Sequence, residues 1–323
     1  MTDLDHLGAD RLSAPGGQPV LIVDAASWRK PAAPIQAVVI GVDPDGVLPV
    51  IVDDDFDLLV TSALAPPWPW VSDTLPDRLA DAVATSPYAA TMAAQVLRLT
   101  AMLPLAEALA VESLAYSALL GGREFARWRA ETPGSAPPAP ADPVTVARNG
   151  NLLTLTLQDP ASRNAMSAPM RDALYEALAN ALDDPSRPEV VLKGAGKCFS
   201  TGGALAEFGM ARDLAEAHSV RTLHNCARAL DALAERATVR LHGACVGSGI
   251  EVAAAAHRRV AAPDAWFQLP ELTMGLIPGA GGTATVARAI GRHRTLWMLL
   301  SAKRVRAALA LEWGLIDAIE DGP

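Results

Sequence analysis

Two glycine-rich turns, at residues 198–205 and 242–251, have the residue types and spacing to carry out chemistry. Each follows an apolar run that predicts a strand. Glycine lets a backbone N–H approach a ligand closely, and the second turn also opens a predicted helix whose dipole adds positive potential. Side by side, the turns would form an oxyanion hole, a pair of N–H groups that stabilise negative charge on an oxygen. The glycine pattern alone is equally typical of ordinary strand-to-helix turns.

A third passage, residues 266–283, adds a glutamate and another glycine-rich loop, and it completes a series of motifs in a fixed order. The series comprises Asp159-Pro160, Asn164-Ala165, the Phe-Ser-Thr-Gly-Gly turn at 199–203, the His-Gly-Ala…Gly-Ser-Gly-Ile-Glu turn at 242–251, Leu269-Pro270-Glu271, Pro-Gly-Ala-Gly-Gly-Thr at 278–283, and residues 310–317. In this order the motifs resemble those of the crotonase (enoyl-CoA hydratase/isomerase) superfamily over about residues 144–321. One motif alone would be a weak signal, whereas the whole set is highly specific.

The resemblance implies an α/β fold, with a crotonase-like ββα spiral core and helical segments, preceded by a small α+β N-terminal region. The residues themselves favour a mostly parallel sheet, because strand-like runs alternate with amphipathic helices after residue 143. We expect a hairpin turning at Asn149-Gly150, a helix over 167–182, helices across 213–236, and strands at 190–192, 239–241 and 258–261.

Four segments are predicted along the chain: a flexible lead (1–17), degenerate crotonase-like strands plus tail-like helices (18–131), a proline-rich linker (132–142) and a crotonase-like catalytic core (143–323). Strands are expected at 20–23, 37–42 and 58–61, and helices from 76 to 130. Family members continue past the core with a helical tail that covers the acyl pocket and supports trimers. Residues 80–130 resemble that tail, so we hypothesise that they supply it from the N-terminal side. The alternative is an unrelated helical domain.

The resemblance also implies which residues act on the substrate. Gly203 and Ser248 correspond to the two oxyanion-hole amides, and Glu251 and Glu271 to the two hydratase glutamates. By this match Glu251 holds the water that adds at Cβ, and Glu271 donates a proton at Cα. Two carboxyls on opposite sides of one water can share acid and base work. Ala204 departs from the family, which often has aspartate there, and this affects substrate preference more than chemistry.

The family's coenzyme A contacts correspond to positions around the first turn. These are Arg163, Asn164, Ala165, Lys197, Thr201 and Gly202. The substrate would be an acyl group carried as a coenzyme A thioester, so we expect no separate cofactor. We expect no metal site either, because the six histidines are scattered and lack ligand spacing.

We therefore expect hydration of a 2-enoyl-CoA to a 3-hydroxyacyl-CoA. Two alternatives stay open: another reaction of the same family, such as isomerisation, dehydration or C–C hydrolysis, and an inactive scaffold that binds CoA esters. Family members form trimers or hexamers, which implies a homo-oligomer here.

Net charge, cysteine spacing and the length of apolar runs argue against several classes of protein. A net charge of −9 argues against non-specific nucleic-acid binding. The three cysteines lack CxxC spacing, which favours the reducing cytoplasm. Uninterrupted apolar runs stay shorter than the roughly 18 residues of a membrane span, so we expect no membrane partner.

Overall fold

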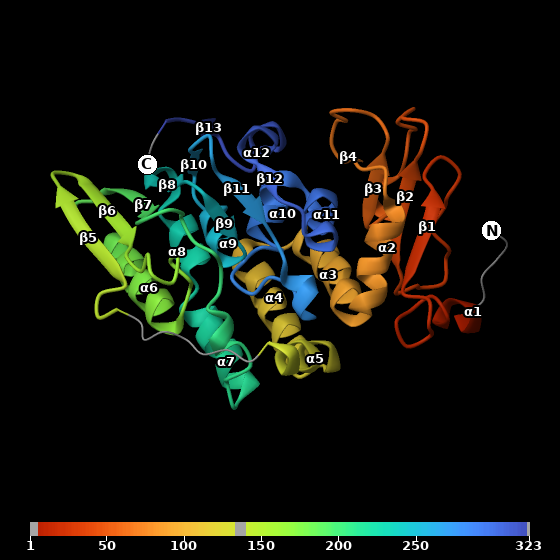
Figure 1. The fold of residues 1–323 in the computed structure, drawn as a ribbon, viewed down its shortest axis with the longest axis horizontal. Helices are drawn as coiled ribbons and strands as arrows, with labels where there is room; N and C mark the ends of the chain where they lie inside the picture. Colours follow the sequence, from red (N-terminus) through yellow and green to blue (C-terminus); the bar gives the residue numbers. More distant parts are fainter. Residues whose placement is uncertain (1–5, 133–139, 322–323) are drawn as a thin grey trace.

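The computed structural model describes residues 6–132 and 140–321, and within them the chain forms three sheets and a set of covering helices (Figure 1). The largest sheet has six strands in the order β13-β10-β8-β7-β6-β5. Its strands pair in parallel, apart from the antiparallel pair β5 and β6. The strands are β5 (Val144–Asn149), β6 (Leu152–Leu157), β7 (Glu189–Gly194), β8 (Ala237–Leu241), β10 (Arg258–Ala261) and β13 (Ala318–Ile319).

The hairpin at the edge of this sheet turns one residue later than the sequence predicted. Asn149 pairs with Leu152, so the two turn residues are Gly150 and Asn151 rather than Asn149 and Gly150. Gly150 has φ +59°, a left-handed conformation that glycine adopts at no steric cost. The glycine therefore fixes the register at the first turn position, and Asn149 stays in the strand.

A second, three-stranded sheet was not predicted. It has the order β12-β11-β9, from β9 (Ala244–Val246), β11 (Trp266–Gln268) and β12 (Val305–Arg306). Its strands are two or three residues long, too short to produce a period-two pattern that sequence reasoning could detect. It matters for function because β9 lies within the second glycine-rich turn and leads directly to Gly247 and Ser248.

Side-chain caps mark the start of three helices of the C-terminal half, α6, α7 and α8. Ser167 caps α6 by accepting from the N–H of Met170 at 3.3 Å, and Asp213 caps α7 in the same manner. These helices are α6 (Ala168–Asp183), α7 (Leu214–Leu223), α8 (Cys226–Ala232), α9 (Ser248–Ala253), α10 (Thr285–Ile290), α11 (Arg292–Ser301) and α12 (Ala307–Trp313), with short 3-10 turns η2 (Leu205–Glu207), η3 (Ala234–Arg236) and η4 (Glu271–Met274).

The N-terminal half opens with a four-stranded parallel sheet in the order β1-β2-β3-β4. Its strands are β1 (Val20–Asp24), β2 (Val38–Asp43), β3 (Leu58–Thr61) and β4 (Val71–Ser72), with the turn η1 (Asp53–Asp55) before β3. The three predicted strands are confirmed to within one residue at either end. Helices follow as α2 (Pro76–Thr85), α3 (Pro87–Thr100), α4 (Leu105–Leu120) and α5 (Arg123–Glu131).

The predicted flexible lead is folded over its described part. Helix α1 (His6–Asp10) is followed by Leu12, which is 8% exposed and whose carbonyl accepts from the N–H groups of Gln36 and Ala37. These bonds tie the lead to the start of β2, which a polar, glycine-ending composition did not reveal. Residues 1–5, and 133–139 of the predicted linker, lie outside the described residues.

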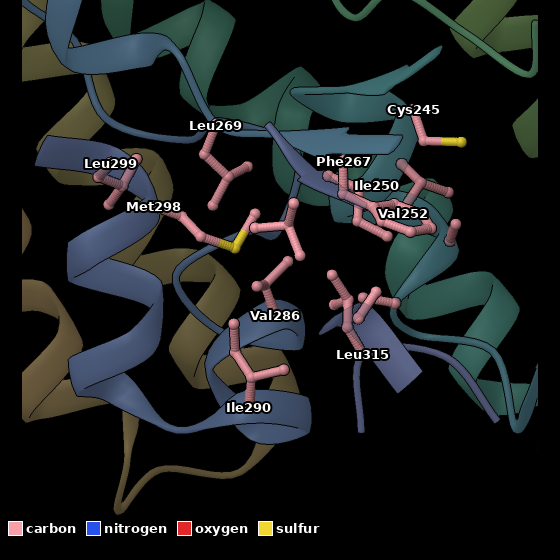
Figure 2. Packing of buried hydrophobic residues seen from close by; sticks show 14 of the residues in the cluster. Cys245, Ile250, Val252, Phe267, Leu269, Val286, Ile290, Met298, Leu299 and Leu315 are labelled. Carbon is pink, nitrogen blue, oxygen red and sulfur yellow. The ribbon is translucent and has the colours of Figure 1, made fainter. Parts of the chain in front are cut away.

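Helices α3 and α4 lie between the N-terminal sheet and the large sheet, and α11 packs against α3 and β3 (Figure 1). One apolar cluster runs through both halves of the chain, and it includes Leu97, Leu119, Phe125, Phe199 and Phe267. Figure 2 shows the C-terminal part of this core around Phe267 and Met298. The two halves therefore share a single hydrophobic core. Across the described ranges, no helix has the length and apolar character required to traverse a bilayer.

Candidate active site

A cavity of about 670 Å³ opens between the two glycine-rich turns, α7 and α4. Gly203, Ser248, Glu251 and Glu271, which are the four residues predicted to act on the substrate, all line it. This volume is typical of sites for small-molecule ligands. The sequence placed these four residues in three separate motifs, and the fold brings them together.

Short parallel pairing holds the two turns against each other. The N–H of Ser200 donates to the carbonyl of Ala244 at 3.1 Å, and the carbonyl of Ser200 accepts from the N–H of Val246 at 3.1 Å. Gly202 lies so close that a Cβ there would be 2.9 Å from the carbonyl oxygen of Val246. The absence of a side chain at this position is therefore what lets the turns meet.

The backbone pairing also directs the N–H of Gly203. Met166 pairs with Gly203 through its two neighbours: its N–H donates to Gly202 at 2.7 Å and its carbonyl accepts from Ala204 at 3.1 Å. In such a parallel bridge the N–H of the central residue points to the opposite side. Among the hydrogen bonds of the described residues, neither the N–H of Gly203 nor that of Ser248 has an acceptor, so both are free for a ligand oxygen.

Glu251 is a buried carboxyl with a fixed orientation. It lies in the first turn of α9 and is 3% exposed. Its Oε2 accepts from the N–H groups of Ala280 and Gly282, at 2.7 and 3.1 Å. Burial raises the pKa of Glu251 to about 7, against the lowering effect of these hydrogen bonds. A carboxyl with this pKa can act as a base near neutral pH.

Glu271 lines the same cavity, but its carboxyl is fixed by fewer hydrogen bonds than that of Glu251. It begins η4 and is 6% exposed, and its Oε2 has no hydrogen-bond partner among the described residues. Burial raises the pKa of Glu271 well above its usual range, and the nearby charges of Glu251 and Glu112 add to the effect. The raised pKa favours the protonated, neutral form of Glu271.

The six predicted coenzyme A contacts differ in whether they line the cavity, are exposed or are buried. Thr201 and Gly202 line the cavity. Arg163 and Lys197 are exposed and lie near the first turn, since the carbonyl of Arg163 accepts from the N–H of Thr201 at 3.1 Å. Ala165 is partly buried, so its role stays a prediction, as do those of Arg163 and Lys197.

Asn164 differs from the prediction. Its side chain is fully buried, where its amide nitrogen donates to the carbonyls of Ala195, Cys198 and Phe199, and its oxygen accepts from the N–H of Asp159. A side chain occupied in this manner holds the turn together and has no group left for coenzyme A. Asn164 is therefore a structural residue rather than a contact.

The sequence model of the enoyl-CoA hydratase/isomerase family matches residues 147–321, more than half of the chain. The chain belongs to this family. It is 33% identical over 176 residues to 2,3-dehydroadipyl-CoA hydratase of Escherichia coli K12, a match that covers 54% of the chain and 68% of that protein.

The chain also matches other relatives, over different shares of their length. It is 31% identical over 177 residues to the fatty acid oxidation complex subunit alpha of Shewanella sp. W3-18-1, covering 53% of the chain but only 25% of that larger protein. Among solved structures, enoyl-CoA hydratase from Thermoplasma volcanium is similar, with a TM-score of 0.52 and 28% identity over 56% of this chain and 73% of that one. The crotonase-like fold of the C-terminal half is thereby confirmed.

The family match begins at residue 147, yet α4 of the N-terminal half also reaches this site. Tyr116 lines the cavity. Its ring packs against Gly279, where an added Cβ would lie 2.8 Å from the nearest ring carbon. The guanidinium of Arg221 from α7 stacks over the same ring, 4.9 Å from its centroid. Residue-level reasoning did not identify Tyr116, Arg221 or the neighbouring Glu112 as site residues. The available signal was an acidic residue, Glu112, in the middle of a mostly apolar helix.

Proposed function

We propose that this enzyme hydrates a 2-enoyl-CoA to the 3-hydroxyacyl-CoA. The N–H groups of Gly203 and Ser248 would bind the thioester oxygen and stabilise the enolate that forms there. Glu251 would take a proton from water, whose oxygen bonds to Cβ, and Glu271 would give its proton to Cα. After each addition the proton on Glu251 has to return to Glu271, through solvent or product exchange, which restores both carboxyls. Over the full cycle water then supplies the hydroxyl at Cβ and the proton at Cα, and no further reactant is needed.

The unlike environments of the two glutamates carry this proposal. Glu251 is fixed by two amides and has a pKa raised to about 7, as suits the residue that orients and deprotonates water. Glu271 has a free oxygen and a strongly raised pKa, as suits a proton donor. Two carboxyls that are held differently in one cavity can divide acid and base work between them.

Double-bond isomerisation is the second candidate. It needs one acid/base residue, and Glu271 with its free oxygen has the properties for that role by itself. The two backbone N–H groups that fix the Glu251 carboxyl favour hydration, because isomerisation would not need that ordered carboxyl. A catalytically inactive CoA-ester scaffold is the remaining alternative.

Hydration of crotonyl-CoA, and of a longer enoyl-CoA, separates these candidates. Glu251→Gln and Glu271→Gln should each lower kcat by about 10²–10⁴-fold. Glu176→Gln, on the exposed face of α6, is the matched control and should keep the wild-type rate. Isomerisation would instead spare Glu251→Gln. Thioester binding with no turnover in any version would support the inactive scaffold.

Three further properties stay proposals of the same kind. We infer that the substrate is carried as a coenzyme A thioester with no other cofactor, that the enzyme works in the cytoplasm, and that it forms a homo-oligomer. Size-exclusion chromatography with light scattering measures the last of these directly.

A further inference from the structure

We propose that Glu112, on helix α4 of the N-terminal half, is a positioning residue that holds the loop 278–283 so that its amides face Glu251. This inference rests on the proposed function, because it assigns a role in orienting one of the two acting carboxyls. Glu112 itself lies behind the loop, 1% exposed, and does not line the cavity.

The loop is clamped between two carboxyls through alternate amides. On one side, the N–H groups of Ala280 and Gly282 donate to Oε2 of Glu251. On the other side, the N–H of Gly281 donates to Oε1 of Glu112 at 2.7 Å, and the N–H of Thr283 donates to Oε2 at 2.8 Å. Four consecutive amides thus point alternately to the substrate side and to α4.

A third bond completes the arrangement. The hydroxyl of Thr283, a fully buried side chain, donates to Oε2 of Glu112 at 2.6 Å. Both oxygens of Glu112 therefore accept, and every partner is a donor. A glutamine at this position would aim its NH₂ group at one of those donors and leave a buried N–H without an acceptor. The site therefore selects a carboxyl group over a carboxamide of the same size.

Glu112 also influences the charge balance of the site. Burial and the charge of Glu251 raise the pKa of Glu112 to about 8, while its three hydrogen bonds lower it. The groups that face it are Glu251 on α9, Glu271 on η4 and, on the opposite side, Arg221 on α7. When ionised, Glu112 opposes ionisation of Glu271. We therefore expect a substitution of Glu112 to change the pH dependence of kcat on its alkaline side.

The test compares Glu112→Gln and Thr283→Val with Glu107→Gln, an exposed glutamate earlier on the same helix. Glu112→Gln should lower kcat for crotonyl-CoA by about 10–100-fold with KM changed less than about threefold, because a misplaced carboxyl affects the reaction more than binding. In Glu112→Gln the alkaline limb of the plot of kcat against pH should move to lower pH. Thr283→Val, which keeps shape and removes one donor, should lower kcat by about 3–10-fold. Glu107→Gln should match the wild type.

Amide hydrogen exchange of residues 276–285 tests the clamp without turnover. Exchange at Gly281 and Thr283 should be faster in Glu112→Gln and Thr283→Val than in Glu107→Gln. Wild-type kcat, pH profile and exchange in both variants would overturn the positioning role while leaving hydration intact. A wild-type enzyme without hydration would instead refute the proposed function, and the exchange data would then decide the clamp alone.

Discussion

The α-carbon of Gly247 lies against the carboxyl of Glu271: a Cβ at position 247 would be 2.8 Å from Oε1 of Glu271 and 3.7 Å from Oε1 of Glu251. The residue just before the predicted oxyanion amide of Ser248 therefore separates the two acids. Its φ of +48° adds a second reason for glycine.

Gly247→Ala should displace Glu271 and lower kcat by about 10²-fold, because small misplacements of acting groups are that costly. The positive φ should also lower the free energy of unfolding by about 1–3 kcal/mol. Gly150→Ala separates the two effects, since Gly150 has φ +59° and nothing within 4 Å of the added Cβ. It should share the stability loss, measured by urea unfolding, and keep full activity. Equal activity in the two variants would contradict the steric argument.

Stability should fall as pH rises from about 6.5 to 8. Folding raises the pKa of Glu251 to about 7 and of Glu112 to about 8, so between an ordinary carboxyl pKa and these values the folded state binds more protons than the unfolded one. The stabilisation is present at lower pH and is lost through this window. Below about 6.5 His293 acts in the opposite direction, because burial lowers its pKa to about 3 and the unfolded ring gains a proton there.

Urea unfolding at pH 6.5, 7.2 and 8 measures this slope. Glu251→Gln should flatten it, since an amide does not titrate, whereas the exposed Glu176→Gln should leave it unchanged. A rise in stability over the same range would show that these carboxyls are ionised in the folded protein throughout.

Glu124 should matter for stability far more than its neighbours on α5. Its carboxylate accepts from the N–H groups of Tyr88 and Ala89, both at 2.9 Å, and so caps the start of α3 from another helix. Glu124→Ala leaves one buried and one partly buried donor unpaired, and should lower the free energy of unfolding by about 1–3 kcal/mol. Glu131→Ala, exposed at the end of α5, is the control. Equal effects would mean that water replaces the lost acceptor.

A chain that begins at Pro143 should neither fold nor turn over substrate. It lacks the apolar faces of α3 to α5, which belong to the same core as the large sheet, and it lacks Glu112 and Tyr116. Supplying residues 1–142 as a separate chain should restore turnover of crotonyl-CoA. Full activity of the shortened chain by itself would refute the hypothesis that residues 80–130 act as the family's helical tail.

Sequence reasoning predicted what depends on local pattern or on an ordered set of motifs. Glu251, Glu271, Gly203 and Ser248 were identified because each belongs to a motif, and the cavity brings them together. The short strands of the second sheet escaped detection because their pairing is entirely non-local. Glu112 escaped for the same reason, since its partners Gly281 and Thr283 lie 169 and 171 residues further along the chain.

That separation has a consequence for biosynthesis. A ribosome adds about 5–20 residues per second, so α4 emerges on the order of 10–30 s before the loop that satisfies Glu112. During that interval the apolar faces of α3 to α5 have no final partner, and a nascent chain in this condition is the substrate that chaperones hold. The N-terminal half therefore completes its final packing only after residues 278–283 have been synthesised.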